Sequence, residues 1–439
     1  MRKWLLTLAL ALPGPALAQE SALASAIAAD DADGLQAALA AGADANAALD
    51  YGESPLARAV DVQDPALVAA LLKAGAKVDR ADALGLTPLL LACEHGNSAI
   101  VQALLAAGVN ARKAGADGVT PLAMCARFSD AAAVQALLAR GATVEAADAR
   151  GQTPLMWATS AGRLEAVSAL LVAGAQVNRV TASGFTPLFF ALASGKADVV
   201  SALIAAGADV HHRGPENTSA LQMALYQKNW GAAEQLVGLG ADLAELDCEG
   251  RRPLHVAAAA GQAGLIAALL AKGADPNALT GPSRITWVTE ANFGVPPPPV
   301  QPTPPLLVAA KAGQADAMQR LIAAGADPHF VDGAGVNLVL AAAGGRSAAA
   351  LGLALDLVPD ANVADAAKNT ALHRLAGGAY FPDLPAMLRL LALHGARTDL
   401  ADAKGKTALQ VLSDGLAPVQ AAFRDAFPAQ PPLGLALSH

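Results

Sequence analysis

Histidine and aspartate side chains cluster at two places where they could bind a metal ion. His211 and His212 are adjacent, and imidazole nitrogens are common zinc ligands. The pair falls in a segment expected to be extended, where successive side chains point to opposite faces. The stretch DDADG, residues 30–34, is typical of the start of a calcium loop, but Gly42 stands where that loop needs a glutamate. We therefore expect no metal and no other cofactor.

Thiol chemistry has three candidates, Cys93, Cys125 and Cys248, and an odd number argues against a fold held by disulfides. Cys93 and Cys125 each replace one alanine of an alanine pair in consecutive copies of a helical pattern. Packed helices lie about 8–10 Å apart, whereas a disulfide needs Cα atoms within about 7 Å. We expect both to be small buried core residues without a bond. Cys248 is predicted to lie on an exposed turn, where a reactive role is open.

Sequence motifs for catalysis are missing. The chain has no nucleophile elbow, phosphate-binding glycine loop, paired-cysteine zinc pattern or HExxH. Its net charge of −8, from 30 Lys and Arg against 38 Asp and Glu, gives no general electrostatic reason to bind nucleic acid. These features predict a protein that is not an enzyme, does not bind nucleic acid, and has another protein as its partner.

The elements that would position any site come from a repeat of 33 residues. Its glycine recurs at Gly42, Gly75, Gly108, Gly141, Gly174, Gly207, Gly240 and Gly273. In the copy GQTPLMWATSAGRLEAVSALLVAGAQVN, Thr153 is expected to cap a first helix and Pro154 to occupy its first turn. Gly162 then allows a turn into a second helix that ends at Gly174. One helix pair cannot bury its own apolar face, so the copies must stack.

This pattern resembles the ankyrin repeat, G-x-T-P-L-H-x-A-A-x-x-G followed by V-x-x-L-L-x-x-G-A-D-x-N, over about residues 20–425. The resemblance implies an all-α solenoid of helix-turn-helix units with β-hairpin fingers, which recognises proteins through its fingers and first helices. We count twelve copies: repeats 1–8 in 19–279, an insertion at 280–303, and repeats 9–12 with a C-terminal cap in 304–425, before a tail at 426–439. The TPLH histidine survives only at His255 and His373, which leaves hydrogen bonding at the other fingers open.

The resemblance also implies protein-contact positions just before the threonine and near the end of the first helix. Carried onto this sequence, these positions include Tyr51, Leu84, Leu86, His95, Val119, Arg127, Phe128, Arg150, Phe185, Tyr226 and Arg251. Tyrosine and arginine are enriched among residues that anchor interfaces, so we expect a protein-binding surface here. The alternative is that these side chains pack on neighbouring fingers.

Two further apolar features allow two interpretations each. A stripe at the repeat period is expected to be core, although it could form a groove for an apolar ligand: Leu91, Met124, Trp157, Phe190, Met223 and Val256. The insertion contains the run Pro296 to Pro299, which favours polyproline II. Its Trp287 and Phe293 either anchor a partner or fold back onto adjacent units.

The N-terminus has the composition of a signal peptide. Arg2 and Lys3 precede an apolar run and a small-residue site that ends at Ala18, so we expect residues 1–18 to be removed near Ala18/Gln19. No later segment is apolar for long enough to span a membrane. The sequence therefore predicts a monomeric protein-binding scaffold that is periplasmic or secreted. Two other functions fit the same features: a secreted effector or effector-neutralising protein, and a carrier of a small apolar ligand.

Overall fold

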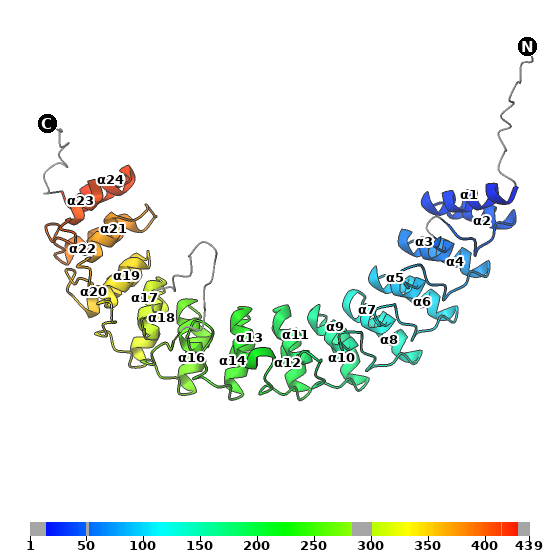
Figure 1. Ribbon diagram of the computed structural model, residues 1–439, viewed down its shortest axis with the longest axis horizontal. Coiled ribbons are helices and arrows are strands. Elements are labelled where there is room, and N and C mark those ends of the chain that lie inside the picture. Colours follow the sequence, from blue (N-terminus) through cyan, green and yellow to red (C-terminus); the bar gives the residue numbers. More distant parts are fainter. Residues whose placement is uncertain (1–14, 50–51, 283–300, 414, 429–439) are drawn as a thin grey trace, which may run out of the picture. The chain divides into compact units, whose positions relative to one another are not determined.

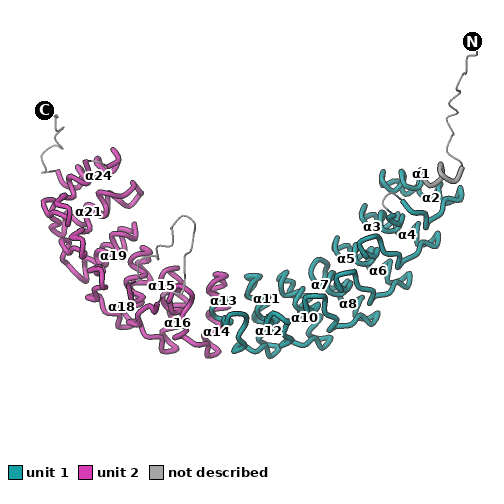
Figure 2. The backbone as a smooth tube through the Cα atoms, in the orientation of Figure 1, with its two compact units in different colours: residues 1–223 teal, residues 224–439 magenta. Residues whose placement is uncertain are grey.

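The computed structural model describes residues 15–49, 52–282, 301–413 and 415–428. Within these ranges the chain forms 24 α-helices and one 3-10 helix (Figure 1). The helices fall into two compact units, residues 1–223 and 224–439 (Figure 2). The all-α fold class expected from the sequence is confirmed.

The helices of unit 1 are short and follow one another in pairs. They are α1 (Pro15–Ala28), α2 (Ala32–Ala40), α3 (Pro55–Val62), α4 (Pro65–Lys73), α5 (Pro88–Glu94), α6 (Ser98–Ala106), α7 (Pro121–Phe128), α8 (Ala131–Ala139), α9 (Pro154–Ser160), α10 (Leu164–Val172), α11 (Pro187–Ser194), α12 (Ala197–Ala205) and the 3-10 helix η2 (Pro215–Asn217).

Unit 2 continues the same alternation and begins inside α13. Its helices are α13 (Ala220–Tyr226), α14 (Trp230–Gly238), α15 (Pro253–Ala259), α16 (Ala263–Ala271), α17 (Pro305–Lys311), α18 (Ala315–Ala323), α19 (Leu338–Gly344), α20 (Ala348–Leu357), α21 (Ala371–Ala376), α22 (Leu384–Leu393), α23 (Ala408–Ser413) and α24 (Ala417–Ala426).

The threonine-proline step starts the first helix of a pair as the sequence predicts. The Thr153 hydroxyl accepts a hydrogen bond from the Met156 amide at 3.4 Å, and Pro154 occupies the first turn of α9. Thr87 and Thr120 cap α5 and α7 in the same way. A threonine cap satisfies an amide that has no partner inside the helix, and proline costs nothing at this position. Each pair therefore begins at a defined residue, which keeps the stack in register.

In unit 1 the odd-numbered helices pack in one row and the even-numbered helices in a second row (Figure 1). Leu155 on α9 and Val167 and Leu170 on α10 have no exposed surface, because they fill the space between the rows. The stripe predicted for the second helix is therefore the core of the stack. We call the side of these odd-numbered helices that faces away from the even row the odd-row face, and no described helix of unit 1 packs on it.

The fingers between helix pairs are closed by tight turns. At one of them the Asp82 carboxylate accepts hydrogen bonds from the amides of Leu84 and Leu86, each at 2.8 Å, and the Asp82 amide donates to the Leu86 carbonyl. Where the ankyrin resemblance implies β-hairpins, strand-type pairing within the described ranges is limited to isolated bridges at Ala364–Thr370 and Ala401–Thr407. The Asp82 carboxylate thus accepts backbone hydrogen bonds of the kind that paired strands make in a longer hairpin.

Hydrogen bonding at the TPLH position does not depend on histidine alone. His255 accepts from the Arg252 amide at 3.2 Å through Nδ1 and donates to the Thr303 carbonyl at 2.9 Å through Nε2. Gln222 and Gln410 stand at the same position in other pairs, and each accepts from the corresponding backbone amide. The question left open by the sequence is answered for these pairs, because glutamine supplies an equivalent acceptor.

The base of the insertion is closed by two threonines. The Thr280 amide donates to the Thr303 carbonyl at 3.1 Å, and the Thr303 amide donates to the Thr280 hydroxyl at 3.0 Å. His255 reaches the same Thr303 carbonyl from α15. Within the described ranges, no helix is both long and apolar enough to cross a membrane.

Candidate functional site

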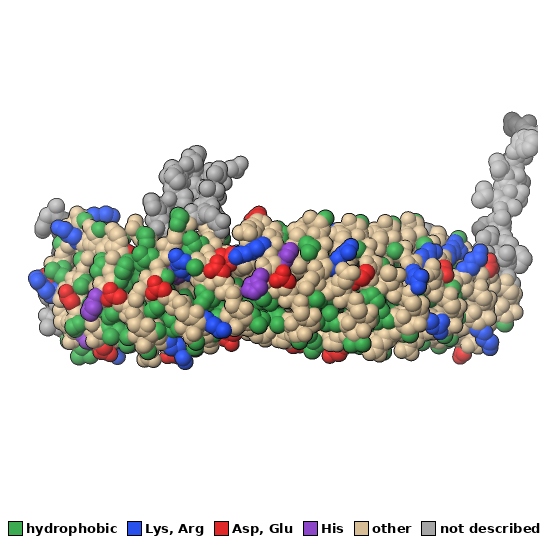
Figure 3. Space-filling view, turned by 90° about the horizontal axis from the view of Figure 1, so that it is seen from below, with side chains coloured by type: hydrophobic (Ala, Val, Ile, Leu, Met, Phe, Trp, Pro, Cys, Tyr) green, Lys and Arg blue, Asp and Glu red, His purple; other side chains and the backbone are tan. Residues whose placement is uncertain are grey.

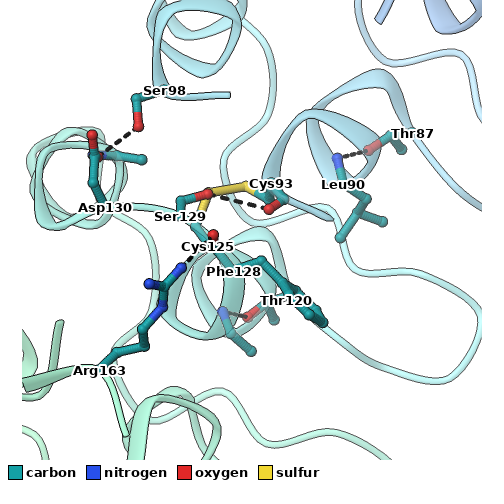
Figure 4. The surroundings of a disulfide bond; sticks show 12 residues. Thr87, Leu90, Cys93, Ser98, Thr120, Cys125, Phe128, Ser129, Asp130 and Arg163 are labelled. Carbon is teal, nitrogen blue, oxygen red and sulfur yellow. Dashed lines mark hydrogen bonds between the residues drawn. A yellow bond between two sulfur atoms is a disulfide. The ribbon is translucent and has the colours of Figure 1, made fainter. Parts of the chain in front are cut away.

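Cys93 on α5 and Cys125 on α7 form a disulfide, with Cα atoms 4.4 Å apart (Figure 4). Both residues are fully buried, as predicted, but the expectation that they lie too far apart to bond is wrong. The distance between helix axes, about 8–10 Å, overestimates the distance between facing Cα atoms, because each Cα lies about 2.3 Å from its axis. Equivalent positions, which are 33 residues apart, point the same way in stacked helices. Cys93 and Cys125 are 32 residues apart, so they occupy different positions in their helices, and their side chains face each other.

Further contacts join the same two helix pairs around the disulfide (Figure 4). The Ser129 hydroxyl donates to the Cys93 carbonyl at 3.2 Å. Between the even-numbered helices α6 and α8, the Ser98 hydroxyl donates to the Asp130 carboxylate at 2.6 Å, and this bond lowers the pKa of Asp130. The disulfide therefore lies where side-chain hydrogen bonds also join the two helix pairs.

Next to this region, Arg127 and Phe128 at the end of α7 meet Trp157 on α9. The Arg127 guanidinium carbon lies 5.2 Å from the centre of the Phe128 ring and 5.4 Å from the Trp157 ring. Arg163 holds the end of α7 by donating to the carbonyls of Arg127 and Phe128, at 3.1 and 2.7 Å. Phe128 remains 39% exposed, and Arg127 is exposed. We call Arg127, Phe128 and Trp157 the Arg127 cluster.

The other predicted contact residues of unit 1 differ in exposure. Leu84 on a finger is 74% exposed, and Arg150 is exposed on the next finger but one. Phe185 is only half-buried, and its ring packs on Phe189 and Phe190 with centroids 6.2 and 5.9 Å apart, so here the alternative of internal packing holds.

Three further residues that were predicted to contact a partner are bound to a neighbouring side chain or are partly or fully buried. Leu86 is half-buried beside its finger, and His95 contacts the Asp61 carboxylate at 3.0 Å. Val119 is only 3% exposed, so its prediction as a contact residue is wrong. Its backbone closes the finger, because its amide donates to the Asp117 carboxylate and its carbonyl accepts from the Gly115 amide.

In unit 2, Tyr226 is 82% exposed at the end of α13. Arg251 lies between two carboxylates, at 2.9 Å from Asp247 and 2.9 Å from Glu249, and these ion pairs hold it along its own finger. Tyr51, Trp287 and Phe293 lie outside the described residues.

The apolar stripe is less buried than a core interpretation requires. Leu91 is 9% exposed, but Met124, Trp157, Phe190 and Met223 are half-buried along the odd-row face of unit 1. A separate open groove of about 660 Å³ lies between α8 and α10 on the even row, lined by Leu138, Leu164 and Val172 among others.

Asp148 is a site residue that sequence reasoning missed. Its Oδ1 accepts from the amides of Arg150 and Gln152, each at 2.9 Å, and its Oδ2 accepts from Trp157 Nε1 at 3.1 Å. This buried carboxylate therefore fixes both the finger and the indole of the Arg127 cluster. The signal was available, because an aspartate precedes the start of the TPL step by five residues in several copies: Asp82, Asp148, Asp247, Asp332, Asp365 and Asp402.

Replacing Asp148 with asparagine is expected to lower the free energy of unfolding by about 1–3 kcal/mol. Asparagine has one oxygen, so either the two finger amides or the indole N–H must face its NH₂ group. Urea unfolding of Asp148→Asn measures the loss. In the Trp157→Phe background, which lacks the indole N–H, the same substitution should cost clearly less. An equal cost in both backgrounds would contradict the coupling between Asp148 and Trp157.

The residues first considered for metal binding make other contacts. His212 Nε2 lies 2.9 Å from the Gly184 carbonyl and the ring meets Phe189 edge-on, while Asp31 caps α2 by accepting from the Gly34 amide. Among the described residues, no group of three His, Cys, Asp or Glu is placed to hold a metal ion. On the face shown in Figure 3, acidic and basic side chains are interspersed.

Comparison with known proteins identifies the repeat. A family model described as "Ankyrin repeats (3 copies)" matches residues 56–148, 122–214 and 207–280, which together span 56–280 of the 439 residues. A search of curated proteins found no match. Ankyrin repeats are generally protein–protein interaction modules, and proteins built from them are typically non-enzymatic scaffolds. The capped helix pairs, the tight fingers and the family match together establish that the chain belongs to the ankyrin-repeat family.

Proposed function

We propose that this chain is an exported, non-enzymatic scaffold that binds another protein through the odd-row face and fingers of unit 1. The observation that carries the proposal is the Arg127 cluster, where an exposed arginine and a 39% exposed phenylalanine lie on a row of half-buried apolar side chains. Aromatic residues and arginine dominate binding energy at protein interfaces when they sit in a surface that a partner can cover.

The repeat array extends beyond residues 56–280 in this proposal. The 24 described helices alternate as twelve pairs, and outside the matched range the turns after α2, α18 and α22 contain a positive-φ glycine, at Gly42, Gly325 and Gly395, as the matched pairs do. We infer that the scaffold is monomeric and is not inserted in a membrane after its leader is removed, since no described helix is long and apolar enough to span one. Its length provides several surfaces, of which the odd-row face of unit 1 has the residues best suited to a protein partner.

Export is supported by the N-terminal sequence and by the Cys93–Cys125 disulfide. Disulfides persist in the periplasm and outside the cell, whereas the cytosol keeps thiols reduced. Fractionation of cells that express the chain naturally, followed by N-terminal sequencing, should find a chain that starts near Gln19 outside the cytosol. A full-length cytosolic chain with two free thiols at Cys93 and Cys125 would contradict export.

Affinity capture from periplasmic extract tests binding. The chain from Gln19 onward is compared with a Leu84→Ala/Phe128→Ala variant, whose changes lie on exposed residues of unit 1, and with a Val172→Ala/Leu393→Ala control, whose changes lie on exposed residues of even-numbered helices. We expect one protein to bind the parent and the control, and to lose at least tenfold in affinity for the Leu84→Ala/Phe128→Ala variant. Equal retention by all three would contradict the proposal.

Two results of the same experiment would instead favour the other functions. A partner found only in extract of a different cell type would indicate a secreted effector or effector-neutralising protein. A bound apolar small molecule without any protein would indicate a ligand carrier.

A further inference from the structure

Arg127 is an exposed cation that forms no ion pair among the described residues. Within the described part of the chain, no carboxylate forms an ion pair with Arg127, and no acceptor takes a hydrogen bond from its guanidinium. The nearby Arg163 differs, because its guanidinium donates to the carbonyls of Arg127 and Phe128. Arg127 is held instead by the rings of Phe128 and Trp157, which fix its position and leave its hydrogen-bonding capacity unused.

The carboxylates around the Arg127 cluster accept hydrogen bonds from other residues. Asp148, the buried acid beside Trp157, accepts three hydrogen bonds from Trp157, Arg150 and Gln152. Asp117 on the preceding finger accepts from the Val119 amide, and Asp130 accepts from Ser98. The exposed Arg150 adds a second cation, which forms no ion pair among the described residues. This part of unit 1 therefore presents two exposed guanidinium groups that form no ion pair among the described residues.

A partner that covers this surface must satisfy the guanidinium that it buries. An arginine taken out of water without an acceptor costs several kcal/mol, and a carboxylate matches its planar, two-pronged donor geometry best. Met124 on α7 and Trp157 on α9 are half-buried, and the Trp157 ring lies 5.4 Å from the Arg127 guanidinium, so a large apolar side chain of the partner could cover them beside Arg127.

We propose that the Arg127 cluster binds a segment of the partner protein in which an aspartate or glutamate stands close to a large apolar side chain. The carboxylate pairs with Arg127, with Arg150 adding long-range attraction, and the apolar side chain lies on Met124 and Trp157. The inference rests on the proposed protein-binding function and specifies the chemistry of the bound segment.

A random-peptide display selection against the chain from Gln19 onward tests this chemistry without a known partner. We expect the enriched peptides to carry Asp or Glu within a few residues of Leu, Ile, Met or an aromatic residue. Their affinity should fall 10- to 100-fold for Arg127→Gln, which removes one charge-assisted pair. Arg127→Lys should lose less, because it keeps the charge, and Arg320→Gln, an exposed arginine on α18, should lose nothing.

The outcomes separate this inference from the broader proposal. Peptides without carboxylates that still lose affinity when Phe128 is replaced would overturn the acidic-segment inference and leave protein binding by this face intact. Peptides that bind Arg127→Gln as tightly as the parent would also overturn it. A selection that enriches no peptide contradicts the inference too, whereas the proposed function is then decided by the capture experiment alone.

Discussion

Replacing Cys93 and Cys125 together with alanine should lower the free energy of unfolding of unit 1 by about 3–4 kcal/mol. The bond closes a loop of 32 residues, and its removal restores that chain freedom to the unfolded state. Alanine is the residue that the repeat pattern has at these positions, so the packing change is small. Urea unfolding of the full chain, with hydrogen exchange of the α5 and α7 amides as the local readout, measures the effect.

The controls for the disulfide prediction are a second variant and a reductant. Cys248→Ala removes the one cysteine outside the bond and should change stability little. Dithiothreitol should weaken the parent to the level of the double variant and leave that variant unchanged. A parent whose stability does not respond to reduction would show that the bond contributes nothing to unit 1.

Lowering the pH from about 6.5 to about 4 should cost unit 2 about 3 kcal/mol through His255 alone. Burial lowers the pKa of His255 from 6.5 to about 4. Between these values the unfolded chain binds a proton that the folded chain does not, so stability falls as the pH falls and stops falling through this group near pH 4. The geometry agrees, because a proton on Nδ1 would face the Arg252 N–H that Nδ1 now accepts.

His255→Gln is the matched variant for the pH prediction. Gln222 and Gln410 show that glutamine supplies the acceptor at this position, and glutamine does not titrate. Hydrogen exchange at α15 and α17 between pH 7 and pH 4 should show a smaller loss of protection in His255→Gln than in the parent. The same loss in both would mean that carboxylates elsewhere, and not His255, set the acid sensitivity of unit 2.

Much of the fold could be predicted because its signals are local and periodic. Thr153, Pro154 and Gly174 act within one turn of their own positions, and their repetition fixes the stack without information on distant contacts. The disulfide was missed because it depends on which sides of two stacked helices face each other. Their separation is one residue shorter than the period, and this offset determines that the two side chains face each other. The average spacing between helix axes gives no information about the offset.

The candidate site was predicted less completely than the fold. Phe128 and Arg150, predicted as contact residues, are exposed, whereas Val119 is buried and Phe185 packs on Phe189 and Phe190 of α11. A contact position taken from a family pattern gives the direction of the backbone, but exposure depends on the size of neighbouring side chains. The recurring aspartate indicates the finger role of Asp148, but its bond to Trp157 could not be predicted from the repeat, because tryptophan stands at this position in this copy only.

Site-specific photo-crosslinking tests the central claim most directly. A photoreactive phenylalanine replaces Phe128 on the odd-row face, or Val172, which is 90% exposed on the even-numbered helix α10, in cells that express the chain naturally. The account predicts one discrete crosslinked protein from position 128 and none from position 172. Crosslinks from position 172 alone, or identical patterns from both positions, would contradict recognition by the odd-row face.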